Sequence, residues 1–302
     1  MLDVRRLRVL AEVAQRGSFS AAADALSLTQ SAVSQHVAAL EREVGMRLVE
    51  RGMRPVELTE AGHALTRHAV GILARLDGAE QELGEIARRR QGRLRFGSFP
   101  TALATLVPPA FSRFRRRHPD VSLTVVDDHL QRLLPRIAGG ELDLALIYEH
   151  DVLPEADLER TVLFEDEFRA ILPARHRLAR RRRPLELTDL AAEPWIGGAP
   201  NSAWFRITGD ACRRAGFTPQ VGFASDDYTA VQALVAAGLG VSVVPGLAAA
   251  HTLPGLEVRP LASGAPVRRI CAARPRDAYH GPAVTAMVDC LRHAATALIR
   301  SS

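Results

Sequence analysis

Residues 17–62 read GSFSAAADALSLTQSAVSQHVAALEREVGMRLVERGMRPVELTEAG, and this stretch decides the fold of the N-terminal part. Ser18 is a favourable N-cap for a helix over 19–26, which is rich in Ala. A short turn at 27–29 follows, and a further helix starts at Thr29 or Gln30 and ends at Gly45. Apolar residues at helical spacing upstream of Gly17 predict another helix before these two.

The helix that starts near Gln30 has two different faces. One face is an apolar stripe of Val33, Val37, Leu40 and Val44. The other is short, polar and mostly uncharged, and it comprises Ser31, Ser34, Gln35, Ala38 and Arg42. Side chains of this kind can enter a major groove and form hydrogen bonds with base edges. The pattern predicts a helix-turn-helix.

Two short strand-like pieces, 47–50 and 56–58, flank an arginine-bearing turn. They predict a two-stranded wing with Arg51 and Arg54 at its tip, where cations can contact phosphates. A three-helix bundle with an incidental hairpin would leave the same pattern, so the residues alone keep both alternatives open.

The same stretch closely resembles the N-terminal signature of LysR-type transcriptional regulators. The resemblance covers nearly all of residues 1–62 without a gap, and its landmarks are Gly17-Ser18-Phe19, Ala21-Ala22, Gln30, Ser34, Leu40-Glu41, Gly45, Arg47-Leu48, Arg51 and Leu58-Thr59-Glu60-Ala61-Gly62. It implies that Gln30, Ser31, Ser34 and Gln35 face the groove and that Arg51 and Arg54 reach the DNA backbone. Val49 stands where Phe is usual, and Gln35-His36 replaces a frequent Arg-Gln, so base preference does not carry over.

Residues 59–89 contain no Pro and predict one long helix of about 45 Å. Its apolar positions repeat at alternating steps of four and three residues: Leu65, Ala69, Ile72, Leu76, Ala79, Leu83 and Ile86. Such a heptad seam favours a helix pair between two chains. A long helix packed on its own domain is the alternative. The resemblance implies dimerisation, since this family pairs through its linker helix.

After Gly92 the chain alternates strand and helix in two similar halves. The first half has expected strands at 94–97, 121–126 and 142–147, with helices at 101–117 and 130–138. About a hundred residues later come strands at 195–197, 220–224 and 241–244, with helices at 202–215 and 228–236. Two such α/β units predict two lobes with mostly parallel sheets.

Ligands of open α/β sheets bind beyond the carboxyl ends of the strands. We therefore expect a cleft between the lobes lined by hydroxyls and aromatic rings, with the candidates Ser98, Thr101, Tyr148, Ser202, Trp204, Tyr228 and Thr229. Hydroxyls and free amides favour a carboxylate or a similar anion, and the rings favour an apolar body. Each residue taken alone is also an ordinary cap or core residue.

The sensor segments 140–145 and 234–245 resemble those of LysR-type regulators in general form. The resemblance implies a periplasmic-binding-protein-like fold, with cross-over strands near 159–172 and 266–273 and a final helix over 282–299. It places Thr101 and Trp204 at effector-touching positions. His129 or Leu130 stands where Ser or Thr is frequent, so the identity of an effector does not carry over.

Composition excludes several other classes. Net charge is +5 with 47% hydrophobic residues, but every basic residue is Arg, and residues 1–59 carry only eight Arg against seven acids. Charge alone does not mark a DNA binder. Three distant cysteines predict reduced thiols in a cytosolic protein. No metal, cofactor or catalytic motif is found, and a solute-binding protein would need a secretion signal. A nucleoid-architectural protein would leave the sensor lobes without a role.

The sequence therefore predicts an α/β fold with an all-α N-terminal part: a winged helix-turn-helix (1–58), a dimerising linker helix (59–91) and a two-lobed effector domain (92–302). Lobe I is expected at 92–160 and 268–302, and lobe II at 161–267. We expect a cytoplasmic transcription regulator, not an enzyme, without cofactor or membrane contact. Its expected partners are double-stranded DNA, a small anionic effector, a second copy in a dimer or tetramer, and RNA polymerase. The effector, the operator and the direction of regulation stay open.

Overall fold

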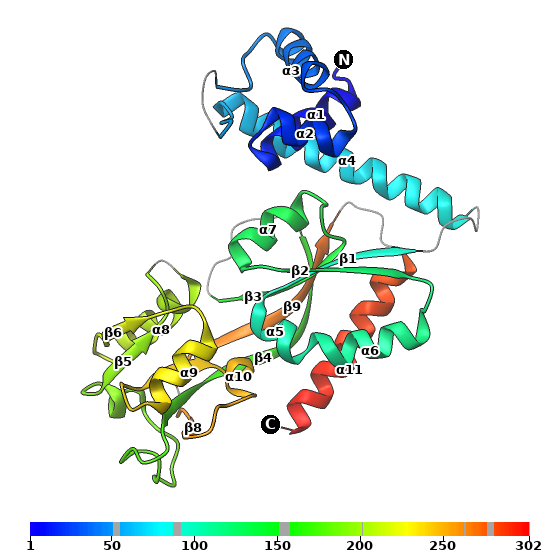
Figure 1. Ribbon diagram of the computed structural model, residues 1–302. Coiled ribbons are helices and arrows are strands. Elements are labelled where there is room, and N and C mark those ends of the chain that lie inside the picture. Colours follow the sequence, from blue (N-terminus) through cyan, green and yellow to red (C-terminus); the bar gives the residue numbers. More distant parts are fainter. Residues whose placement is uncertain are drawn as a thin grey trace.

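The structure is a computed structural model that describes residues 1–50, 55–86, 92–150, 158–200, 202–262, 264–276 and 281–301. From the N-terminus, Figure 1 shows a small helical domain, one long helix that runs between the two parts of the molecule, and a larger α/β domain of two lobes.

Three helices form the N-terminal domain: α1 (Val4–Arg16), α2 (Phe19–Leu26) and α3 (Gln30–Val44). Each begins at a capping side chain, because Asp3, Ser18 and Thr29 accept hydrogen bonds from the free amides of the first turns. Gly17 and Gly45 end α1 and α3 with φ of 61° and 71°, a left-handed conformation that favours glycine. The expected helix boundaries are therefore confirmed to within two residues.

The wing is held to α3 by a carboxylate. Val49 and Leu58 form an isolated antiparallel bridge, and the Glu50 amide donates to the Glu57 carbonyl at 2.9 Å. Glu41 Oε1 on α3 accepts from the Leu48 amide at 2.9 Å. These contacts form the base of the expected hairpin and hold it on α3; Arg51 and Arg54, expected at its tip, lie outside the described residues.

The linker helix α4 (Glu60–Ile86) presents part of its apolar seam to the N-terminal domain. Ala69 is fully buried there, and Leu65 packs against the same core. The seam beyond this point is open: Ile72, Leu76 and Leu83 are 40%, 41% and 65% exposed. Leu65, expected in the dimer seam, therefore already has an intrachain partner. The Ile86 side chain lies outside the described part.

The sensor domain has two lobes joined by long strands. Its elements are β1 (Arg93–Ser98), α5 (Pro100–Thr105), α6 (Val107–Arg117), β2 (Ser122–Asp127), α7 (Leu130–Ala138), β3 (Leu144–Glu149), β4 (Leu158–Pro173), η1 (Leu187–Leu190), β5 (Pro194–Gly197), α8 (Ala203–Arg214), β6 (Gln220–Ala224), α9 (Tyr228–Ala236), β7 (Ser242–Pro245), α10 (Gly246–Ala249), β8 (Leu256–Pro260), β9 (Val267–Pro275) and α11 (Pro282–Ser301).

Strands β4 and β9 run antiparallel through both lobes. The main sheet has the order β2-β1-β3-β9-β4-β7, with β8 also paired to β4, and β5-β6 form a second sheet. Separate hydrophobic clusters lie in the two lobes, one around Phe96 and Phe114 and the other around Phe168 and Trp195. In Figure 1 the two strands form the connection between the lobes.

Two expectations for this domain need correction. The single helix expected over 101–117 is two helices that meet at Leu106, because Pro108 and Pro109 lack the N–H groups that a continuous helix requires. The sheets are also less parallel than expected. Strands β4, β7, β8 and β9 pair antiparallel, and the β8 strand is additional to those expected.

Candidate nucleic-acid interface and small-molecule cleft

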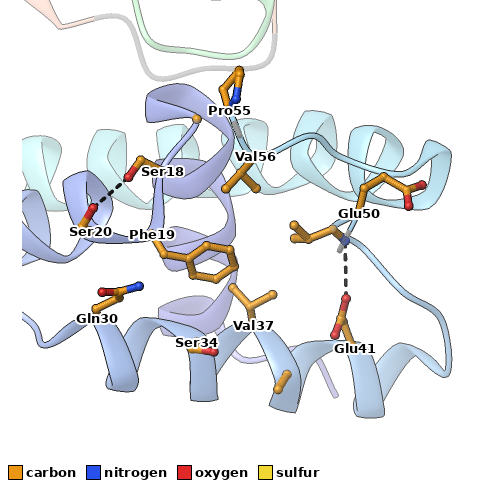
Figure 2. Close-up of a pocket in the computed structure, with 13 residues that line it drawn as sticks. Ser18, Phe19, Ser20, Gln30, Ser34, Val37, Glu41, Glu50, Pro55 and Val56 are labelled. Carbon is orange, nitrogen blue, oxygen red and sulfur yellow. Dashed lines mark hydrogen bonds between the residues drawn. The ribbon is translucent and has the colours of Figure 1, made fainter. Parts of the chain in front are cut away.

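The outer face of α3 borders a hollow of about 800 Å³ between the helices and the wing. Gln30 and Ser34 line it from α3, and Ser18 and Ser20 line it from the start of α2 (Figure 2). Phe19 and Val37 form its apolar base. Small hydrogen-bonding groups that a nucleic-acid edge can reach thus line the side of α2 and α3, while Glu50, Pro55 and Val56 line the side of the wing.

Ser31 and Gln35 are exposed on the same helix but do not line this hollow. The Ser31 hydroxyl lies 3.0 Å from that of Thr29, which caps the helix. Glu41, a landmark of the signature, was not among the expected site residues, yet its carboxylate accepts from the Val49 amide of the wing and borders the hollow (Figure 2). The signature includes Glu41 but indicates no role for it, because its partners are the backbone amides of Leu48 and Val49, which only folding brings near.

A second hollow, of about 280 Å³, lies between the two lobes. Phe99, Pro100, Thr101, His129, Leu130, Gln131, Arg132 and Tyr148 line it from lobe I, Pro200, Ser202, Ala203, Trp204, Asp226 and Tyr228 from lobe II, and Arg268 from the connecting strand β9. Five of the seven expected residues are therefore brought together here. Its helix starts, hydroxyls and rings surround a space large enough for a small molecule.

Ser98 and Thr229 do not reach this hollow. Ser98 ends β1 with its side chain fully buried, and its hydroxyl donates to the Phe99 carbonyl at 3.2 Å. Thr229 is exposed in the first turn of α9, where its amide donates to Asp227 Oδ1. Being next to a strand end or a helix start does not decide which way a side chain points.

Arg268 is the buried charged group of this hollow that sequence reasoning missed. Only 3% exposed, it donates from Nε to Asp166 Oδ2 and from Nη2 to Thr101 Oγ1, both at 2.9 Å. Its guanidinium lies over the rings of Phe99 and Tyr148, 5.1 and 4.8 Å from their centroids. Asp166 Oδ1 also accepts from the Leu247 amide at the start of α10. This cluster joins both connecting strands to both lobes.

Aromatic rings form the other walls. Trp204 Nε1 donates to the Val243 carbonyl at 2.9 Å, which orients the indole beside Tyr228, with ring centroids 4.8 Å apart. Burial raises the pKa of Tyr228 and of Tyr148 above the ordinary phenol value, although the nearby Arg268 opposes this for both. Both hydroxyls are therefore neutral at physiological pH and can donate hydrogen bonds.

The described residues give little support for a metal site, a reactive thiol or a membrane-spanning helix. No group of three or more His, Cys, Asp or Glu side chains there could hold a metal ion. Cys212, Cys271 and Cys290 are all buried, and burial raises the pKa of each thiol, to about 11 for the first two. Among the described helices, none is both long and apolar enough to cross a membrane.

Comparison with known families accounts for both parts of the chain. Residues 4–63 match the family described as "Bacterial regulatory helix-turn-helix protein, lysR family", and residues 87–296 match "LysR substrate binding domain". The chain belongs to the LysR-type transcriptional regulators. LysR-type proteins are DNA-binding transcriptional regulators that respond to effectors. The expected fold and function class are therefore confirmed.

The curated relatives are named as transcription regulators of different kinds. The chain is 30% identical over 261 residues to the transcriptional dual regulator GltC of Bacillus subtilis, covering 85% of each chain. It is 33% identical over 243 residues to a probable hydrogen peroxide-inducible genes activator of Mycobacterium avium, covering 79% of this chain and 76% of the relative. These relatives are regulators, in line with the expectation that this LysR-type protein is not an enzyme.

Solved LysR-type structures share the whole architecture. A full-length OxyR variant from Pseudomonas aeruginosa aligns with a TM-score of 0.74 at 26% identity, over 97% of this chain and 98% of that one. CbnR complexed with its target DNA aligns at 0.64 with 22% identity, over 97% and 100% of the two chains, and at that identity it shows the fold alone.

Proposed function

We propose that this LysR-type regulator binds operator DNA as a dimer or tetramer, and that a small anionic molecule with an apolar ring binds between its lobes and changes the DNA complex. The observation that carries the effector proposal is the buried Arg268 guanidinium at the hollow between the lobes. It is a fixed cation set among Phe99, Tyr148, Trp204 and Tyr228, which offer faces and edges to a flat ring.

The DNA half of the proposal rests on α3. Gln30, Ser31, Ser34 and Gln35 are all exposed on it, and they are the residues we propose to read base edges. Arg51 and Arg54 would hold phosphates on either side of the groove. As a regulator of transcription the bound protein would act on RNA polymerase, and a cytoplasmic location follows from that role.

Assembly is proposed through the exposed part of the α4 seam. Ile72, Leu76 and Leu83 present apolar side chains to solvent at heptad spacing, and a second copy of the same helix would cover them. Two α3 helices would then enter successive major grooves.

A mobility shift with DNA from upstream of the protein's own gene tests the DNA half. Ser34→Arg would place a long cation on the reading face and should abolish the competitor-resistant shift. Ser112→Arg on α6 adds the same charge far from α3 and should leave the shift unchanged. Equal loss in both variants, or binding by the unmodified protein that falls steeply with salt and competitor, would contradict base reading through α3.

Calorimetric titration with benzoate and with benzamide, its neutral analogue, tests the effector half. Benzoate should bind and benzamide should bind more weakly, because only the carboxylate carries a negative charge and two equivalent acceptor oxygens for the Arg268 guanidinium. Arg268→Lys should weaken benzoate binding by roughly 10- to 100-fold. Arg259→Lys is the matched control, since Arg259 is also a buried arginine but bonds to the Ala179 and Arg183 carbonyls. Equal affinity for the two compounds would refute the anionic class.

The peroxide response named for some relatives is not part of this proposal. Thiol oxidation begins from the thiolate, which burial suppresses at all three cysteines. A reversible change of DNA binding upon treatment with dilute hydrogen peroxide would contradict that exclusion.

A further inference from the structure

Helix α7 has the cleft at one end and the linker helix at the other. Its first turn, with His129 before it, lines the hollow between the lobes. Its last residue, Ala138, and the following Gly139 and Gly140 border a separate hollow against α4. Figure 1 shows α7 next to α4, on the side of lobe I that faces the N-terminal domain. Nine residues, about 13 Å of helix, thus separate the effector cleft from the linker helix.

Helix α4 lies so close to the end of α7 that neither Gly139 nor Gly140 has room for a side chain. A Cβ added to Gly139 would lie 2.6 Å from Val70 Cγ1. A Cβ added to Gly140 would overlap the Ala74 methyl, and Gly140 has φ of +74°. The two glycines together form a flat seat on which Val70 and Ala74 rest.

Helix geometry places the two residues that touch the glycines on the other side of α4 from the proposed dimer seam. At 3.6 residues per turn, Ile72, Leu76 and Leu83 share one side of α4. Val70 and Ala74 project about 160° away from that side. A second α4 helix can therefore cover Leu76 and Leu83 while Val70 and Ala74 rest on lobe I; Ile72 also lines the hollow beside the two glycines.

Helix α7 is also firmly part of lobe I. Leu130, Leu133, Leu134 and Ile137 are all buried in its core, so packing rather than the helix hydrogen bonds alone holds α7 as one piece across its internal Pro135. A displacement at the first turn would therefore reach the glycine seat.

We propose that Gly139 and Gly140 are the docking surface of the sensor domain for the chain's own linker helix, and that α7 connects this surface to the cleft. Occupation of the hollow shifts α7 between packed positions, and the seat transfers the shift to α4, which carries the DNA-binding domains. The contact between the two glycines and α4 does not depend on any effector. The link through α7 rests on the proposed function, because it takes the hollow between the lobes as the effector site.

Hydrogen exchange of the full-length protein tests the docking without a ligand. Gly140→Ala should raise exchange by about tenfold in residues 66–77 of α4 as well as around the seat. Gly216→Ala is the matched control: Gly216 has φ of +88° but open space around it, so it carries the same backbone strain without a clash. It should leave residues 66–77 unchanged.

The variant Gly140→Ala/Ala74→Gly supplies the rescue. Removing the Ala74 methyl leaves the Ala74 Cα nearest to the new Cβ, at an ordinary contact distance of 3.5 Å. Exchange in residues 66–77 should return to the level of Ala74→Gly alone. The docking would be overturned if Gly140→Ala left the exchange of residues 66–77 unchanged, or if Gly216→Ala raised it equally. It would also be overturned if Ala74→Gly did not rescue Gly140→Ala.

The connection is tested by filling the hollow with a side chain instead of a ligand. Ala203→Trp, from lobe II, and Gln131→Trp, on α7 itself, both place a ring at the hollow, and the second serves if the first does not fold. Either should change exchange in residues 66–77 severalfold in the wild-type background and leave it unchanged in the Gly140→Ala background. No change, or the same change in both backgrounds, would overturn the connection. Because no effector is added, this outcome is separate from that of the benzoate titration.

Discussion

Replacing Asp166 with Asn should strongly destabilise the sensor domain, because it leaves a buried arginine without a counter-charge. The side chains of Asp166 and Arg268 are each 4% exposed and lie 2.9 Å apart. The carboxylate also accepts from the Leu247 amide at 3.0 Å, so both of its oxygens are in use. An Asn side chain has one acceptor oxygen and turns an NH₂ group towards one of the two donors.

The expected loss in free energy of unfolding depends on whether a variant leaves a buried charge or only a buried amide without a partner. Breaking a buried ion pair by removing one partner costs about 3–5 kcal/mol. Asp166→Asn and Arg268→Met should therefore each lose about this much free energy of unfolding. The double variant Asp166→Leu/Arg268→Met leaves no buried charge, and its main cost is the orphaned Leu247 amide, about 1–3 kcal/mol. The double variant should thus be more stable than Asp166→Asn or Arg268→Met.

Urea unfolding followed by tryptophan fluorescence measures this effect. The only two tryptophans, Trp195 and Trp204, are both buried in lobe II, so the signal reports the sensor domain. Glu167→Gln is the control: it breaks a half-exposed ion pair with Arg169, which is worth about 0–1 kcal/mol. A double variant that loses the sum of the single losses would refute the coupling, as would Asp166→Asn within about 1 kcal/mol of the unmodified protein.

Three further predictions concern thiols, acid and assembly. Native Cys212 and Cys271 should react slowly with maleimide at pH 8, since a thiol pKa of about 11 leaves about one thiolate in a thousand; fast labelling before unfolding would contradict this. Burial alone raises the pKa of Asp189, but hydrogen bonds from Arg181 and a backbone amide outweigh it and lower the pKa. The stability from the Asp189–Arg181 pair is therefore present at neutral pH and is lost as the pH falls through the folded-state pKa of Asp189. Asp189→Asn should make the free energy of unfolding less dependent on pH in acid. An unchanged acid dependence would count against the pairing. Leu76→Glu should raise the dimer dissociation constant at least about a hundredfold by analytical ultracentrifugation, and an unchanged constant would exclude the seam.

Local chemistry explains why so much of the fold was predictable. The caps at Ser18 and Thr29 and the glycines after α1 and α3 act on residues within four positions, so they can be recognised in the chain itself. The same holds for the strands and helices of the two α/β halves, which the alternating pattern indicated, whereas the cross-over strands came from the family resemblance and β8 was not expected. The break at Leu106 was equally local, and Pro108-Pro109 could have revealed it.

The sequence by itself determined the helix-turn-helix, the linker helix, the two α/β halves and the family, because these depend on periodicity and on short motifs. Only the tertiary structure decided which side chains share the cleft. Ser98 and Arg268 illustrate this: the first turns inward from a predicted site loop, and the second arrives from a strand 167 residues after Thr101 to bond with it. The seat of Gly140 beneath Ala74 is likewise a matter of packing. Contacts between residues far apart in the chain leave no periodic trace, since each partner satisfies its own local pattern equally well without the other.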